Sequence, residues 1–207
     1  MWGNVAHLFA AVSLPMEWQP LGSNLPIRNN FLSRWIGRAV LRTMGWRVEG
    51  QIPNRQQLVV ALVPHSSNID FLLTMAVLWG LGLRAVFMMK HSLFWFPLGP
   101  ALRYLGGIPV DRRSSQGLVE QMRDRFSAQP KLVLGITPEG TRGGATEFKT
   151  GFACIAAAAK VPVLPAVLDY QQRTVRFAQL IEEVSDVGAI VDRVRLEAAT
   201  GRARSAR

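Results

Sequence analysis

His65 and Asp70 are the two residues of this sequence whose types and spacing best suit proton-transfer chemistry. They form the pattern H-x-x-x-x-D directly after an apolar run at residues 58–63. Neutral imidazole takes a proton from a hydroxyl near neutral pH, and a carboxylate on the other ring nitrogen stabilises the imidazolium that forms. The pair therefore predicts a general base, His65, oriented by Asp70. As a bare pattern it is common, and a loop histidine beside a helix-capping aspartate explains it more simply.

Two further polar clusters follow short apolar runs. Residues 111–113 (Asp-Arg-Arg) follow the run 107–110, and residues 137–142 (Thr-Pro-Glu-Gly-Thr-Arg) follow the run 132–136. Ligands of open α/β sheets bind beyond the carboxyl ends of the strands. If the runs are neighbouring parallel strands, the three clusters meet at one edge of the sheet and surround a single cleft.

The arginines of these clusters suit a phosphate group. A guanidinium donates paired hydrogen bonds to phosphate oxygens, which favours Arg112, Arg113 and Arg142 as phosphate ligands. Glu139 is expected to accept hydrogen bonds from a polyol or to hold Arg142 in place. For Arg112 and Arg113 the sequence leaves a second interpretation open, in which they are surface charges paired with neighbouring acids.

The order of apolar runs and helical patterns predicts an α/β fold with a mixed, largely parallel sheet flanked by helices, preceded by an N-terminal amphipathic helix. A helix from residue 69 to 80, capped by Asn68, would place Asp70 in its first turn. Residues 92–105, rich in aromatic residues, Pro and Gly, are not assigned a helix. The expected strands are residues 58–63, 84–89, 107–110, 132–136, 161–168 and an edge strand at 174–177; the other expected helices are 115–127, 153–160 and one in the tail from 185.

The amphipathic helix is expected to begin after Asn30 and to end at Gly45. Its apolar side chains share one face, and three arginines line another face at intervals of four residues: Leu32, Trp35, Ile36, Ala39 and Val40 on the first, Arg34, Arg38 and Arg42 on the second. A basic helix with Trp on its apolar side suits an anionic bilayer surface. The alternative is a helix that packs on the core and exposes its arginines to solvent.

Composition narrows the class of protein. The 207 residues fit one domain, and the net charge of +10 indicates an anionic partner, although a coding bias towards Arg is an alternative cause. Cys154 is the only cysteine, so no intrachain disulfide forms, and the cysteine and three histidines lack metal-ligand spacing. Residues 1–14 do not read as a signal peptide, and no run predicts a membrane-spanning helix with confidence. We therefore expect a cytoplasmic origin.

Four ordered blocks resemble the glycerolipid acyltransferase family, typified by 1-acyl-glycerol-3-phosphate acyltransferases. Residues 65–70 resemble its H-x-x-x-x-D block, and residues 106–112 (Gly-Gly-Ile-Pro-Val-Asp-Arg) its second block. Residues 138–142 match P-E-G-T-R, and residues 161–165 (Val-Pro-Val-Leu-Pro) are similar to the fourth block. A looser F-K-x-G element at residues 148–151 also fits.

The resemblance implies a reaction in which an acyl group passes from a coenzyme A or acyl-carrier-protein thioester to a lysolipid hydroxyl, with lysophosphatidic acid as the default acceptor. His65 and Asp70 are then the catalytic pair. The residues implied for substrate binding are Arg112, Glu139, Gly140, Thr141, Arg142 and Lys149. No metal and no cofactor beyond the thioester co-substrate are expected. The implied partners are the lysolipid, the donor and an anionic membrane surface, with no nucleic acid, and the expected location is peripheral, on the cytoplasmic face of the inner membrane.

The same reading divides the chain into three parts: residues 1–45 as a membrane-contacting segment with the basic helix, 46–184 as the acyltransferase α/β domain, and 185–207 as a basic C-terminal helix and tail. Departures from the family pattern at Pro64, Pro109 and Thr137 leave the acceptor open, so lyso-ornithine lipid or lysocardiolipin are alternatives. Two alternatives belong to other functional classes: a thioesterase, and a non-catalytic basic protein that binds membrane or nucleic acid. No nucleic-acid-binding motif is present in the sequence.

Overall fold

A seven-stranded sheet forms the centre of the computed structural model, which describes residue 18 and residues 20–28, 30–65, 67–110, 115–139 and 148–203. The strand order is β1-β7-β6-β2-β5-β3-β4. The strands are β1 Arg47–Glu49, β2 Gln57–Val63, β3 Val86–Lys90, β4 Gly107–Val110, β5 Leu132–Ile136, β6 Val163–Asp169 and β7 Thr174–Phe177. All neighbouring strands pair in parallel except β6 and β7, which are antiparallel. The predicted mixed, largely parallel sheet is confirmed.

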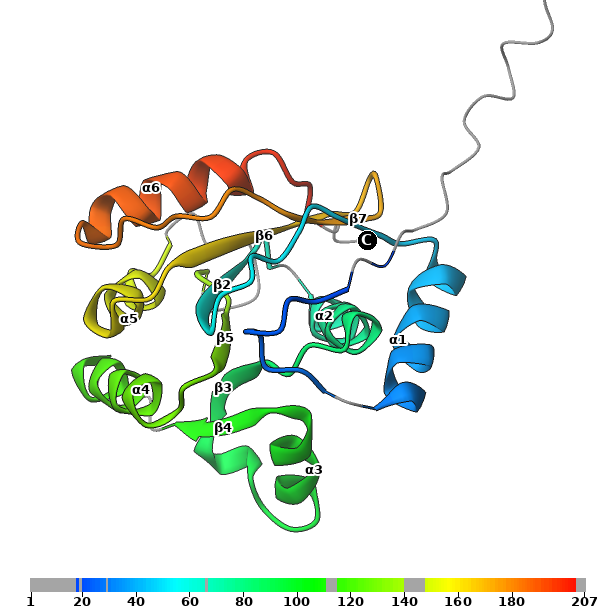
Figure 1. Cartoon of the computed structure of the whole chain (residues 1–207), viewed down its shortest axis with the longest axis horizontal. Coiled ribbons are helices and arrows are strands. Elements are labelled where there is room, and N and C mark those ends of the chain that lie inside the picture. Colours follow the sequence, from blue (N-terminus) through cyan, green and yellow to red (C-terminus); the bar gives the residue numbers. More distant parts are fainter. Residues whose placement is uncertain are drawn as a thin grey trace, which may run out of the picture.

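Helices cover both faces of the sheet, with α4, α5 and α6 on one side and α1 and α2 on the other (Figure 1). The helices are α1 Phe31–Met44, α2 Asn68–Leu81, α3 Leu98–Leu105, α4 Ser115–Ala128, α5 Gly151–Ala159 and α6 Val187–Ala198, with a short 3-10 turn η1 at His91–Leu93. Successive strand residues point to opposite faces. On β2, Val59 and Ala61 therefore pack under α5 and α6, whereas Leu58 and Leu62 pack on the side of α1 and α2. Burial on both faces explains why the strands read as continuous apolar runs.

Three details differ from the sequence-based expectation. Ser67, rather than Asn68, caps α2, because its extended backbone lets its side chain accept a hydrogen bond from the amide of Ile69. β7 is not an edge strand, since β1 pairs along its outer side. A helix, α3, lies within the aromatic segment; it begins after Pro97, and Gly106, at a φ of 105°, ends it in the left-handed conformation that glycine tolerates best.

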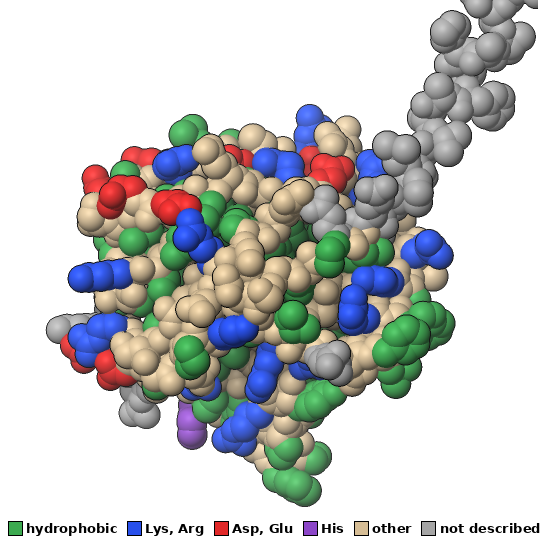
Figure 2. Space-filling model, in the orientation of Figure 1, with side chains coloured by type: hydrophobic (Ala, Val, Ile, Leu, Met, Phe, Trp, Pro, Cys, Tyr) green, Lys and Arg blue, Asp and Glu red, His purple; other side chains and the backbone are tan. Residues whose placement is uncertain are grey.

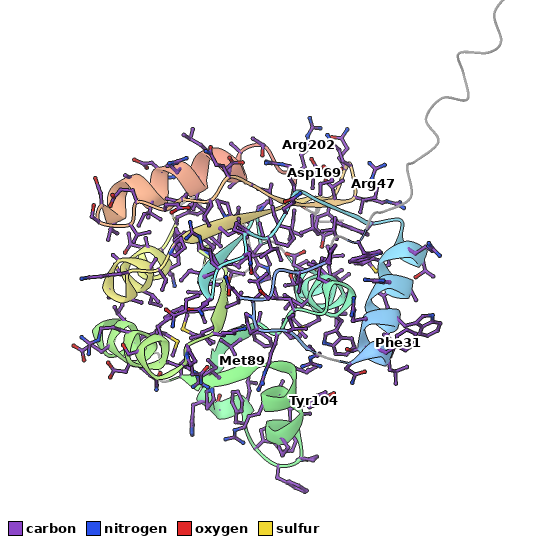
Figure 3. All side chains as sticks on the ribbon, viewed as in Figure 1. Phe31, Arg47, Met89, Tyr104, Asp169 and Arg202 are labelled. Carbon is purple, nitrogen blue, oxygen red and sulfur yellow. The ribbon has the colours of Figure 1, made fainter. Side chains whose placement is uncertain are left out.

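The helix α1 begins after its cap Asn30 and ends at Gly45, as predicted. Its small-residue face, not its apolar face, packs on α2: a Cβ on Gly37 would lie 2.4 Å from the amide nitrogen of Gly80, so glycine permits the close approach. Phe31 is 84% exposed and Trp35 60% exposed, and Figure 3 shows Phe31 on the outer side of the helix. The helix therefore does pack on the core, through Ser33, Gly37 and Leu41, but most of the predicted apolar face stays exposed.

Arg42 of α1 is exposed to solvent, as the alternative expects, but Arg38 is not. The Nε of Arg38 donates to the carbonyl of Gly80 at 2.9 Å, near the end of α2, and its guanidinium lies 4.8 Å from the ring centre of Trp18. Burial, and after it the charge of Arg34, lowers the pKa of Arg38. A cation is favourable at this position because it meets the negative end of the α2 dipole. Within the described residues, no helix has the length and hydropathy needed to cross a bilayer.

Candidate active site

His65 lies just beyond the carboxyl end of β2, in the turn that leads into α2. Its Nδ1 is 3.1 Å from Oδ2 of Asp70, and the His65 side chain is 15% exposed whereas that of Asp70 is fully buried. The contact has the length of an ion pair, but the ring N–H is not aligned with the carboxylate as a hydrogen bond. Such contacts commonly tighten when substrate binds. The predicted pairing of the two residues is thus present in the fold.

Asp70 is held from both sides. The backbone N–H of Ser67 donates to its Oδ2 at 2.8 Å, and the hydroxyl of Tyr170 donates to its Oδ1 through a short hydrogen bond. The Ser67 contact is half of a capping box that starts α2, so the same carboxylate orders the helix and faces His65. Hydrogen bonds to both oxygens favour the charged form of a buried carboxylate. The arrangement supplies a fixed negative charge beside the imidazole.

Glu139 lies at the end of β5, the parallel neighbour of β2, and is 6% exposed. Its Oε2 accepts a hydrogen bond from the backbone N–H of His65 at 2.8 Å, across 74 residues of sequence. Two of the three clusters therefore meet at one sheet edge, as the sequence predicts. Glu139 thus contacts the loop that carries His65 and can position it. The sequence did not suggest this positioning role.

Burial raises the pKa of the Glu139 carboxyl above its ordinary value. The hydrogen bond from the His65 amide and the charge of His65 act in the opposite direction, and the charge of Asp70 raises the pKa further. Two carboxyl groups thus flank one imidazole. Oδ2 of Asp70 faces the ring at 3.1 Å, whereas Glu139 bonds the backbone N–H of the same residue.

The remaining predicted ligands are placed only in part. Arg112, Gly140, Thr141 and Arg142 lie outside the described residues, as does Arg113. Lys149 is exposed, and its backbone N–H donates to the carbonyl of Pro138 at 2.8 Å. That bond returns the chain to the end of β5 directly beside Glu139. β4, which Arg112 follows in sequence, ends at the same sheet edge as β2 and β5, because all three run parallel.

Sequence analysis missed Tyr170. The residue directly follows β6, and its ring packs edge-on against Trp46 with ring centres 4.9 Å apart. β6 is the parallel neighbour of β2, and Val63 is level with Val167. The signal was available, since Tyr170 is a polar side chain after a buried strand, as are His65 and Glu139. The sequence did not show, however, that β6 lies next to β2, which is what brings Tyr170 to Asp70.

The chain is similar in sequence to known acyltransferases. The model of the family described as Acyltransferase matches residues 46–169. The chain is 30% identical over 152 residues to a 1-acyl-sn-glycerol-3-phosphate acyltransferase of Haemophilus influenzae, covering 69% of this chain and 61% of that protein. It is 31% identical over 149 residues to the human 1-acyl-sn-glycerol-3-phosphate acyltransferase beta, covering 68% of this chain and 53% of that one. The chain therefore spans between half and two thirds of the length of these relatives.

A solved structure shares the fold. The 1-acyl-sn-glycerophosphate acyltransferase PlsC of Thermotoga maritima superposes with a TM-score of 0.52 at 17% identity, over 84% of this chain and 80% of that one. At this identity the likeness concerns the architecture of the sheet and its helices.

Proposed function

The chain belongs to the Acyltransferase family, and we propose that it transfers an acyl group from a thioester to the hydroxyl of a lysophospholipid. The observation that carries the proposal is the His65–Asp70 contact of 3.1 Å, with the carboxylate fully buried and bonded on both oxygens. A carboxylate bound in this way is a costly arrangement for a merely structural turn. It is the arrangement that a histidine general base needs.

In the proposed reaction the Nε2 of His65 takes the proton of the acceptor hydroxyl, because Nδ1 faces Asp70. The hydroxyl oxygen attacks the thioester carbonyl carbon, a C–O bond forms, and the tetrahedral intermediate breaks its C–S bond. The thiolate leaves, and the proton held by the imidazolium passes to it or to water. No protein nucleophile is required, since the substrate brings its own hydroxyl.

We further propose 1-acyl-glycerol-3-phosphate as the acceptor, with coenzyme A or acyl carrier protein as the thiol of the donor. The acceptor follows from the names of the curated relatives and from the arginines of the family blocks, Arg112 and Arg142. A guanidinium pair suits a phosphate monoester. The exposed apolar face of α1 supports peripheral contact with a membrane surface, and we propose the cytoplasmic face of the inner membrane as its location.

The test is transfer of radiolabelled acyl groups by the purified protein, from acyl-coenzyme A and acyl carrier protein, to a panel of lysophosphatidate, lyso-ornithine lipid and monolysocardiolipin. We expect labelled phosphatidate from lysophosphatidate, and a loss of roughly 100- to 10,000-fold in His65→Ala. The matched control is His91→Ala, which changes an exposed histidine in η1 and should keep full activity.

The outcomes separate the alternatives. Release of free thiol without any acylated lipid would indicate a thioesterase and overturn the transferase proposal. Product from another lysolipid alone would retain the mechanism and correct the acceptor. Equal activity of His65→Ala and His91→Ala would remove the general-base role.

A further inference from the structure

A cleft of about 370 Å³ lies at the sheet edge opposite to His65. The first residue of β3, Val86, and the start of β4 from Gly107 line its floor. β3 and β4 run parallel to β2 and β5, so their amino ends lie at the edge away from the catalytic pair. Val86 is level with Leu134, and Leu134 with Val59, which precedes His65 by six residues. Along the strand direction the lining therefore extends from about 20 Å from the base, at Val86, to about 10 Å from it, at Pro109, which is level with Met89.

Among the described residues that line this cleft, none is acidic and four are arginines: Arg28, Arg84, Arg103 and Arg125. They come from four separate segments, namely the stretch before α1, the turn before β3, and the ends of α3 and α4. Figure 2 shows the corresponding gathering of Lys and Arg side chains in the lower centre of this face, between α3 and α4. Folding has brought like charges together, which is unfavourable unless an anion offsets it.

The four guanidinium groups lack carboxylate partners in the described part of the chain. Two of their nitrogen atoms, Nη1 of Arg28 and Nε of Arg125, are buried without a hydrogen-bond acceptor among those residues. Buried donors in native proteins are nearly always satisfied, and those that are not commonly mark the position of a ligand or an ion. Both atoms belong to side chains that line the cleft.

Two of the arginines are held in place in advance. The guanidinium of Arg28 lies 4.9 Å from the ring centre of Tyr104 and 5.9 Å from that of Trp79, and its Nη2 donates to the carbonyl of Tyr104 at 2.9 Å. The guanidinium of Arg103 lies 5.3 Å from the ring centre of Phe94. Aromatic and backbone contacts of this kind fix the donors before a ligand arrives, which lowers the entropy lost on binding.

Backbone hydrogen bonds join the segment that carries Arg28 to the segment that carries Arg84. Arg28 N–H donates to the carbonyl of Gly82, and Arg84 N–H donates to the carbonyl of Pro26, each at 2.8 Å. These bonds flank an antiparallel bridge between Ile27 and Leu83. Arg28 and Arg84 are thus fixed on either side of this bridge, although 56 residues separate them in sequence.

We propose that this cleft is a second anion site, which binds a phosphate monoester or diphosphate group remote from the catalytic pair. Four positive charges without an acid require a ligand with two or more negative charges, and the guanidinium fork matches phosphate oxygens in pairs. Exposed apolar side chains lie near by in sequence, with Ile27 beside Arg28 and Phe96 shortly before α3. The phosphate therefore has two sources, an anionic lipid headgroup or a soluble phosphate ester. The proposal does not depend on acyl transfer.

The first experiment measures the affinity of pyrophosphate by titration calorimetry. It uses the Arg112→Gln/Arg142→Gln protein as background, which removes the proposed acceptor site from the signal. Adding Arg84→Gln and Arg125→Gln should weaken pyrophosphate binding roughly tenfold or more. The matched control adds Arg47→Gln and Arg193→Gln, which remove the same charge from exposed positions on β1 and α6; its affinity should stay within about twofold.

The second experiment measures co-sedimentation with phosphatidylcholine vesicles with and without phosphatidate. A loss of phosphatidate-dependent binding in the cleft variant alone supports the proposal and identifies a lipid headgroup. Pyrophosphate binding without any phosphatidate dependence supports it and identifies a soluble ester. Absence of both, or equal losses in the cleft and control variants, overturns it. Acyl transfer by Arg84→Gln/Arg125→Gln to detergent-dispersed lysolipid is expected to match wild type, which separates this test from that of the proposed reaction.

Discussion

The two edges of the sheet differ in how their charged side chains are bonded within the fold. At the carboxyl edge Asp70 is fully buried, both its oxygens accept hydrogen bonds, and Glu139 bonds the backbone of His65. At the amino edge, Arg28 and Arg125 each keep a buried nitrogen without an acceptor in the described residues, and the cleft is open. The carboxylates around His65 are fixed by satisfied hydrogen bonds, and the unaligned Nδ1 of His65 still faces a carboxylate at 3.1 Å, whereas the buried arginine nitrogens face no acid of the described residues and are free to bind a ligand. The contrast predicts that substitutions at the first edge change turnover and those at the second change binding.

The largest effect is expected for Asp70→Asn. Tyr170 and Ser67 both donate to the carboxylate, so an amide turns its own NH₂ towards one donor and removes the charge beside His65. We expect the turnover number to fall roughly 100- to 10,000-fold and the free energy of unfolding to fall by about 1–3 kcal/mol. Steady-state acyl-transfer kinetics and urea denaturation measure the two. Asp124→Asn, at an exposed aspartate of α4, is the control; a turnover number within about twofold of wild type in Asp70→Asn would break the comparison.

Glu139→Gln keeps an oxygen that can accept from the His65 amide but removes the second negative charge. We expect a loss of roughly tenfold in turnover, and a larger loss in Glu139→Ala, which removes the acceptor as well. An equal loss in both variants would show that the charge contributes and the hydrogen bond does not.

The same substitution tests the pH dependence of stability. Because the folded pKa of Glu139 is raised, the folded state binds the proton before the unfolded state does as the pH falls. The carboxyl group therefore adds stability to the wild type as the pH drops from above the folded pKa towards the ordinary glutamate value of 4.5. Denaturation at several pH values should show that the free energy of unfolding of the wild type, relative to that of Glu139→Gln, increases as the pH falls over this range. A difference that stays constant with pH would contradict the raised pKa.

Tyr170→Phe should have a smaller effect, because Ser67 still holds Asp70. Loss of one hydrogen bond to the carboxylate is expected to lower the turnover number by roughly tenfold with little change in KM. Tyr104→Phe, at the only other tyrosine of the chain and at the opposite edge, is the matched control and should leave both constants unchanged. A fall in stability without a fall in turnover would show that the hydroxyl bond to Asp70 stabilises the fold and does not contribute to catalysis.

The smallest effect on catalysis, and a selective effect on binding, is expected for Phe31→Ser/Trp35→Ser. Both side chains are more than half exposed on the outer face of α1. If this face enters a bilayer surface, their removal should weaken co-sedimentation with anionic vesicles by at least about tenfold. Leu196→Ser removes an exposed apolar side chain on α6, away from α1, and serves as control. Undiminished vesicle binding in the double variant would place the membrane contact elsewhere.

The sequence by itself predicted most of the helices and strands and the pairing of His65 with Asp70. Strands buried on both faces leave continuous apolar runs, so β4 and β5 were predicted with the bounds observed. His65 and Asp70 lie on one strand–turn–helix unit, where local geometry alone brings them together. α3 was missed because its aromatic and Pro-containing surroundings hide the helical pattern, and it depends on contacts with the rest of the chain.

The tertiary structure decided everything that depends on which strands are neighbours. Tyr170 reaches Asp70 across 100 residues, and Glu139 reaches His65 across 74. The arginine cleft gathers four segments, none of which is unusual alone. The direction of α1 was likewise undecided, since an apolar face packs on a core or faces outward with equal ease, and close contact through Gly37 settled the choice. Periodicity records how a segment is buried, whereas strand order and helix contacts arise from the packing of the whole chain.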